Sequence, residues 1–106
     1  MALPHLAPRE KTHLLSVELP TDTKTSALVK TDRFEAVKLV LAEGEEISSH
    51  AVAGYATIHC LQGSVIIDAA GQVQLNAGDW LYLDRGQQHS VAAREDSSLL
   101  VTILFD

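Results

Sequence analysis

From residue 27 onward the chain consists of short apolar runs separated by polar or glycine-containing turns. The apolar residues do not recur at the i, i+3, i+4 spacing of an amphipathic helix over any long window. Short runs with closely spaced turn signals predict an antiparallel β-sandwich or barrel, so we expect an all-β domain. The predicted strands cover residues 27–30, 34–42, 47–52, 55–61, 64–68, 72–75, 80–83, 89–94 and 99–105.

The first 26 residues have a different texture, with all three prolines of the chain and a polar run at residues 21–26. Pro8 suits the first turn of a short helix, whereas residues 13–19 equally suit a strand, so the sequence leaves residues 8–19 open. We therefore predict a short N-terminal arm over residues 1–26 and one barrel domain over residues 27–106. A chain of 106 residues has room for a single core.

Several predicted strands are apolar on both faces, whereas a half-buried strand alternates apolar with polar residues. In the last strand Leu99 points to one side, while Leu100 and Leu104 point to the other. The outer face therefore needs a cover, which either the arm or a second copy supplies; we favour a sheet-on-sheet homodimer. Trp80 and Tyr82 share one strand face and either line the barrel or pack outside it.

The charge balance excludes several classes of partner. Fourteen acidic and eight basic residues give a net charge of −6, and the basic residues form no run. Nucleic acid and anionic membrane surfaces are therefore disfavoured as partners. The sequence shows no membrane-length apolar stretch and no secretory signal, and Cys60 has no second cysteine to pair with. We expect a cytoplasmic protein.

Glycine and histidine residues recur in a fixed order in two stretches. The first stretch contains Gly44, His50 and Gly63, and the second contains Gly78, Gly86 and His89. Their spacing resembles the two sequence motifs of the cupin family, over about residues 36–95. The resemblance implies a double-stranded β-helix, the jelly-roll barrel of the compact bacterial cupins.

The same resemblance implies a metal site of three histidines and one glutamate, from which this chain departs. Val52 occupies the position of the second histidine, and the glutamate position falls on Ala56, or on Thr57 under the longer spacing. His50 and His89 are the two family ligands that remain. A catalytic metal site usually has three protein ligands, so the loss weakens the case for a metal enzyme.

Substitute ligands are conceivable on the strand at residues 55–61. Cys60 shares the inward direction of position 56 on a regular strand, whereas His59 would need a bulge to turn inward. The commoner role of such a cysteine is that of a small buried apolar residue. No cofactor is certain from the sequence; a divalent iron, manganese, zinc or nickel ion held by His50 and His89 stays open.

We expect His50 and His89 to face one pocket at the barrel mouth, the usual place for a ligand in a small barrel. Small apolar residues beside two imidazoles suit a small organic ligand that carries a carboxylate, hydroxyl or carbonyl group. The predicted lining comprises His50, Val52, Ala56, Ile58, Cys60, His89, Val91 and Ala93.

Three classes of function are compatible with this site, because a fold does not fix a function. We favour non-enzymatic binding of a small molecule. The alternative is a metal-dependent cupin oxygenase, isomerase or lyase with a reduced ligand set, and the third is a purely structural or interaction role. No catalytic residue can be named, since neither a nucleophile elbow nor a phosphate-binding glycine loop occurs in the sequence.

Overall fold

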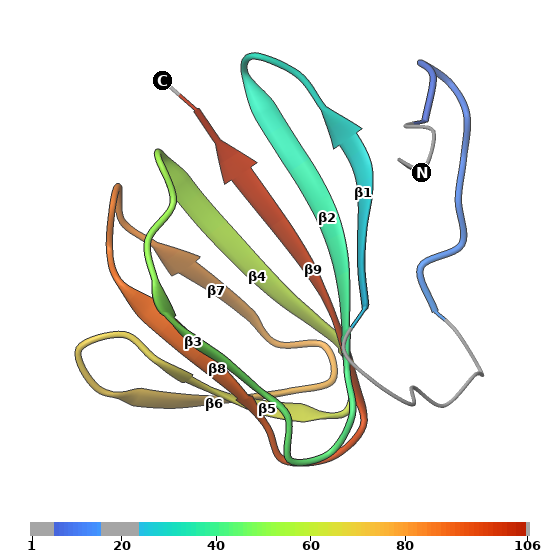
Figure 1. The fold of residues 1–106 in the computed structure, drawn as a ribbon. Coiled ribbons are helices and arrows are strands. Elements are labelled where there is room, and N and C mark those ends of the chain that lie inside the picture. Colours follow the sequence, from blue (N-terminus) through green and yellow to red (C-terminus); the bar gives the residue numbers. More distant parts are fainter. Residues whose placement is uncertain (1–5, 16–23, 106) are drawn as a thin grey trace.

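The computed structural model describes residues 6–15 and 24–105, and these residues form nine strands and no helix (Figure 1). The prediction of an all-β chain is confirmed, and each predicted strand corresponds to one observed strand. The strands are β1 (Lys24–Lys30), β2 (Phe34–Leu41), β3 (Glu46–His50), β4 (Tyr55–Gln62), β5 (Ser64–Asp68), β6 (Gln72–Asn76), β7 (Trp80–Leu83), β8 (His89–Ala93) and β9 (Ser97–Leu104).

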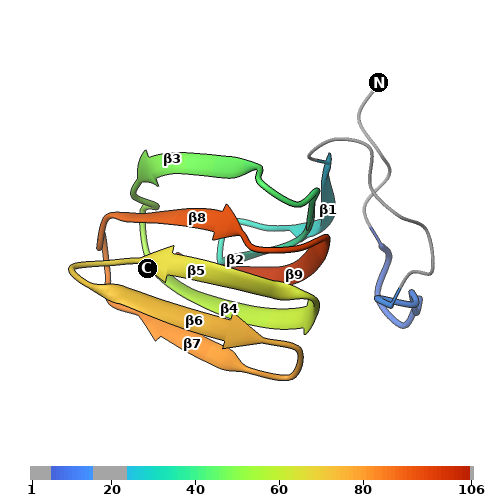
Figure 2. The same cartoon turned by 90° about the horizontal axis from the view of Figure 1, so that it is seen from below.

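The strands form two antiparallel sheets that face each other (Figure 2). One sheet has five strands in the order β1-β2-β9-β4-β7, and the other has four in the order β3-β8-β5-β6. The chain crosses repeatedly from one sheet to the other through short connections of one to five residues. This arrangement of two facing antiparallel sheets is that of a jelly roll, so the predicted fold class is confirmed.

The hydrophobic core lies between the sheets and follows the alternation of side chains along each strand. On β4 the side chains of Ala56, Ile58 and Cys60 are almost completely buried, and on β8 those of Val91 and Ala93 are buried too. The residues between them on the same strands are only partly buried and face outward. The core between the two sheets is therefore built from apolar side chains of both.

The described part of the N-terminal region lies beside the free edge of β1 (Figures 1 and 2). Its backbone turns at Arg9, which has a φ of 75°, and the Glu10 N–H donates to the Ala7 carbonyl at 3.0 Å. Residues 8–15 are thus neither helix nor strand, and residues 16–19 lie outside the described residues. The division into an arm of residues 1–26 and a barrel of residues 27–106 stays a prediction; β1 begins at Lys24.

A glycine at the β3–β4 loop allows this loop to pack closely against the end of β9. Gly54 has a φ of 152°, and a Cβ atom at this position would collide with the backbone of Leu104. The Gly86 N–H also donates to the Gly54 carbonyl at 3.3 Å, which joins the β3–β4 loop to the β7–β8 loop. Because His50 ends β3 and His89 begins β8, these two loops fix the end of the barrel at which both histidines lie.

Candidate ligand site at the barrel mouth

The two histidines meet through the pairing of β3 with β8. Ile47 lies opposite Val91 and His50 lies opposite His89, so three residue steps on β3 match two on β8. The extra residue on β3 forms a β-bulge. On a regular strand two residues three positions apart point to opposite faces, and the bulge brings Ile47 and His50 to the same face. The two imidazole rings come within 4.3 Å of each other, measured between centroids, at an interplanar angle of 55°.

Both rings are held by backbone carbonyl groups. His50 Nδ1 lies 2.9 Å from the Ser48 carbonyl oxygen, and His89 Nδ1 lies 3.2 Å from the Gln87 carbonyl oxygen. A carbonyl oxygen only accepts hydrogen bonds, so in each ring Nδ1 is the donor and carries the proton. In the neutral state each Nε2 atom therefore has a free lone pair, which can accept a hydrogen bond or bind a metal.

The two rings differ in their exposure. The His89 side chain is 5% exposed, whereas His50 is open to solvent. Burial lowers the pKa of His89, the bond to the Gln87 carbonyl partly offsets this effect, and a charge on His50 lowers the pKa of His89 further. His89 is therefore held in its neutral form at neutral pH.

The two candidate positions for the family's glutamate point to opposite faces of β4. Ala56 points inward and is 2% exposed, whereas Thr57 lies on the opposite face of β4. Among residues 6–15 and 24–105 no cluster of three His, Cys, Asp or Glu side chains could hold a metal ion. Two imidazoles do not make the three-ligand set of a catalytic metal centre, so the residues present do not fit a resident metal.

The predicted lining residues lie at different depths. Val52, in the β3–β4 loop, packs against the core near His50, while Ile58 and Val91 belong to the close-packed core itself. Ala93 lies at the far end of β8, where its carbonyl accepts from the Gly44 N–H.

Cys60 also lies at this far end. Its thiol lies 3.5 Å and 3.7 Å from the carbonyl oxygens of Gln62 and Gly63, at the β4–β5 turn. Burial, followed by the charge of Asp79, raises the pKa of this thiol. The structure therefore brings His50 and His89 together but does not place Cys60 with them. His59, the other substitute considered, lies on the outer side of β4, opposite Trp80 on the neighbouring strand.

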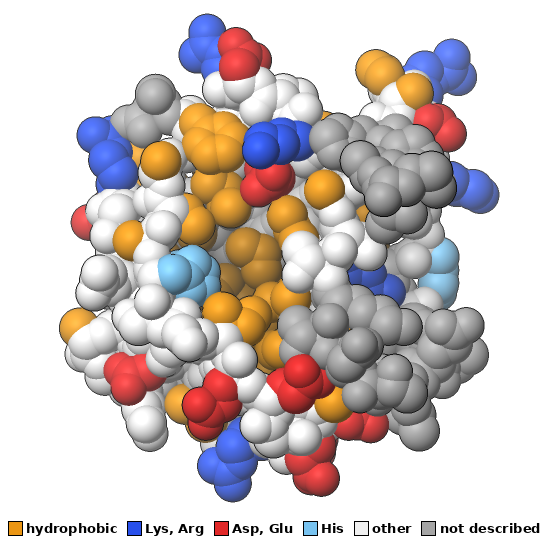
Figure 3. Space-filling model, viewed as in Figure 1, with side chains coloured by type: hydrophobic (Ala, Val, Ile, Leu, Met, Phe, Trp, Pro, Cys, Tyr) orange, Lys and Arg blue, Asp and Glu red, His pale blue; other side chains and the backbone are white. Residues whose placement is uncertain are grey.

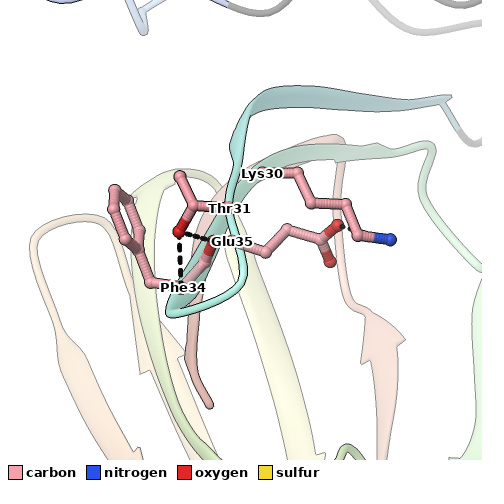
Figure 4. Close-up of polar contacts among 4 residues, drawn as sticks. All are labelled: Lys30, Thr31, Phe34 and Glu35. Atoms are coloured by element: carbon pink, nitrogen blue, oxygen red, sulfur yellow. Dashed lines mark hydrogen bonds and ion pairs between the residues drawn. The ribbon is translucent and has the colours of Figure 1, made fainter.

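Two charged residues at the same end of the barrel were missed by the sequence reasoning. Lys30 and Glu35 are partners across the β1–β2 hairpin, with Lys30 Nζ 3.7 Å from Glu35 Oε2. Their side chains project to one side of the hairpin, and Phe34 projects to the other (Figure 4). The signal was the alternation of β2: Leu39 and Leu41 point into the core, so Glu35 takes the same direction.

The Thr31 side chain makes this hairpin turn rigid. Its hydroxyl oxygen accepts hydrogen bonds from the N–H groups of Arg33 and Phe34, both at 3.0 Å. Figure 4 shows the contact with Phe34. Such a side-chain-to-backbone turn fixes the ends of both strands. The backbone positions of Lys30 and Glu35, which flank the turn, are fixed with it.

The space between the sheets is open on the face seen in Figure 3. Hydrophobic side chains form the floor of a hollow over β4 and β9, beside a histidine side chain at its edge. A separate depression of about 360 Å³ lies on the outer face of the four-stranded sheet and is lined by residues such as Glu46, Ser48, Asp68 and Ser90. Neither His50 nor His89 lines that depression.

Comparison with known proteins agrees with the two motifs. The sequence profile of the cupin domain matches residues 37–105, which is more than half of the chain. The chain belongs to the cupin domain family. None of the curated proteins compared with this cupin matches it.

Solved structures similar to this cupin share its fold at low sequence identity. A cupin superfamily protein from Desulfitobacterium hafniense has a TM-score of 0.82 and 20% identity, with 100% of this chain and 99% of that chain covered. An RmlC-like cupin from Desulfovibrio desulfuricans has a TM-score of 0.78 and 23% identity, with coverages of 91% and 97%. The cupin domain of Cnp3 from Schizosaccharomyces pombe has a TM-score of 0.77 and 22% identity, with coverages of 91% and 74%.

In the part of the chain that the structure describes, no helix has the length and apolar character needed to cross a membrane. The cytoplasmic location stays a prediction.

Proposed function

We propose that this cupin is a non-catalytic protein that binds a small organic ligand at the barrel mouth, between His50 and His89. The observation that carries the proposal is the pair of imidazoles 4.3 Å apart, each with its Nδ1 atom bound to a backbone carbonyl. This arrangement presents two free Nε2 atoms at fixed positions, and such preorganised polar groups give a ligand its orientation.

The surroundings of the histidine pair favour an organic ligand. Val52, at the family's second histidine position, and Ala56, one of the two possible glutamate positions, place apolar side chains at this end of the barrel. Ligand sites are mostly apolar with a few well-placed polar groups, and the hollow between the sheets has this character (Figure 3). A metal-dependent oxygenase, isomerase or lyase has less support, because the site lacks a third metal ligand and two imidazoles hold a metal only weakly.

The proposal is tested by screening small organic fragments against the purified protein with ligand-observed NMR, together with the metal content measured by mass spectrometry. We expect fragments to bind, and we expect His50→Ala or His89→Ala to weaken their binding by about tenfold, the loss for one hydrogen-bonding anchor. His13→Ala is the matched control, because His13 is exposed in the N-terminal segment. We also expect less than stoichiometric metal.

A different pattern would contradict the proposal. Stoichiometric iron, manganese, zinc or nickel that is lost in both His50→Ala and His89→Ala would favour the metal-dependent enzyme instead. If neither substitution changes fragment binding, the histidine pair is not part of the binding site.

We also propose that the protein is a homodimer joined through the outer face of its five-stranded sheet. Four of its large exposed hydrophobic residues, Phe34, Trp80, Tyr82 and Leu104, lie on β2, β7 and β9 of this sheet. The outward positions of β2, β4, β7 and β9 contain no acidic residue, although the chain has 14 of them. Lys38 is the one Lys, Arg, Asp or Glu residue among these outward positions. Few charges and enrichment in aromatic residues are typical of the centre of a protein interface.

The size of this face supports a second copy as its partner. Five strands of up to eight residues form a surface of roughly 600 Å², from the usual strand spacing and rise. Stable interfaces bury about 800 Å² on each partner, so the face is of the right order. The described residues 6–15 lie beside β1 and leave the face open (Figure 2).

A further inference from the structure

The barrel mouth contains charged groups on both of its walls. Register and burial place four ionisable side chains other than Cys60 at inward positions of the described strands: Lys30, Glu35, His50 and His89. The other inward positions are apolar or carry small hydroxyl groups. These four residues are therefore exceptions among the inward positions of the barrel.

All four residues lie at the same end of the barrel. One row of cross-strand partners runs over the whole five-stranded sheet. It consists of Lys30, Glu35, Ile103, Ala56 and Leu83. Within this row, Ala56 is connected to His50 by the β3–β4 loop, and Leu83 is connected to His89 by the β7–β8 loop. Facing sheets are about 10 Å apart, so the ion pair and the histidine pair border the same opening.

Hydrogen-bond acceptors dominate this opening. The Nε2 atoms of His50 and His89 accept because both Nδ1–H groups are already bound to carbonyl oxygens. Glu35 adds a carboxylate that is only 19% exposed. Among the four inward side chains Lys30 is the cation, and its Nζ lies 3.7 Å from Glu35 Oε2.

We propose that the mouth selects small apolar molecules whose polar end donates hydrogen bonds, an amine or an alcohol, over carboxylic acids. This inference rests on the proposed function and narrows the ligand classes expected from the sequence. An ammonium or hydroxyl group finds acceptors at the histidine pair and at Glu35. A carboxylate meets the two lone pairs of the histidine pair, which offer it no donor, and beside them the Glu35 carboxylate, whose charge the Lys30 ammonium partly offsets.

The test uses three probes with the same aromatic body: benzylamine, benzyl alcohol and benzoate. Each is titrated into the protein at about pH 8, above the ordinary pKa range of histidine, and binding is followed by the NMR signals of the His50 and His89 rings. We expect benzylamine and benzyl alcohol to bind, and benzoate to bind at least about tenfold more weakly, as expected for an unpaired charge.

The Glu35→Gln variant tests the second wall of the mouth. We expect it to weaken benzylamine binding by about fivefold and benzyl alcohol binding by less than about twofold, because the ammonium group is the one that gains from a carboxylate. Glu43→Gln is the matched control, since it removes the same charge from the exposed β2–β3 turn at the other end of the barrel. The amide spectrum verifies the fold of each variant.

The outcomes separate this inference from the function on which it rests. If benzoate binds at the histidine pair as tightly as benzylamine, the inference is wrong while the proposed binding function stands. If no probe shifts the signals of either histidine ring, both are wrong. If Glu35→Gln changes the three probes equally, Glu35 is not part of the site.

Discussion

His89 combines burial with a titratable ring, and this has a measurable consequence for stability. In the unfolded chain a histidine takes up a proton near pH 6.5, whereas burial lowers the pKa of His89 in the folded protein. As the pH falls through 6.5, the unfolded state therefore binds more protons than the folded state at this position. The free energy of unfolding decreases as a result.

We predict that replacing His89 with glutamine flattens the fall of stability with pH. In urea unfolding between about pH 5 and pH 8, the wild-type protein should lose more stability toward acid than the His89→Gln variant does. The carboxylates titrate in both proteins, so their contribution cancels in the difference. Two parallel curves would mean that His89 is not shielded from solvent in the folded protein.

At the scale of the elements, the loops beside the histidines depend on glycine for different reasons. Gly54 and Gly71 both have a positive φ, of 152° and 133°. A Cβ atom at Gly54 would collide with the Leu104 backbone, whereas one at Gly71 would meet nothing within 4 Å. The first glycine is required by packing and by conformation, the second by conformation alone.

We therefore predict unequal costs for two alanine substitutions. Gly71→Ala should lower the free energy of unfolding by about 1 kcal/mol, the strain of a side chain at positive φ. Gly54→Ala should lower it by at least roughly 2 kcal/mol, because β9 must also move away from the loop. Urea unfolding measures both values, and equal losses would contradict the close approach of the loop to β9.

The elements also show how far the sequence predicts the fold and the site. Alternating and short apolar runs were sufficient to predict all nine strands, because turns and side-chain direction depend on residues that are close in sequence. The bulge between Ile47 and His50 was not predictable, since it depends on the pairing of β3 with β8. The motif resemblance gave His50 and His89, whereas Lys30 and Glu35 required the register of the hairpin to connect them with the mouth.

The whole molecule presents an uncovered apolar sheet face, and its test is the state of association. Trp80 and Tyr82 are 60% and 52% exposed on this face, so charging them should leave the monomer folded. We predict that light scattering during gel filtration gives twice the chain mass for the wild-type protein. The double variant Trp80→Glu with Tyr82→Glu should give the single chain mass, because two buried charges oppose association.

A control on the other sheet separates a specific interface from general stickiness. Val73 on β6 is 44% exposed, and Val73→Glu should leave the dimer intact. If the wild-type protein is a monomer at high concentration, or if Val73→Glu separates the copies as well, the proposed interface is wrong.

The most direct test of the central claim is the state of the two imidazoles, recorded by long-range proton–nitrogen NMR at about pH 8. We predict that both rings carry their proton on Nδ1, that their protons show mutual contacts, and that adding a chelator changes nothing. Protons on Nε2, rings without contact, or a spectrum that the chelator alters would contradict a metal-free pair of acceptors at the mouth of this barrel.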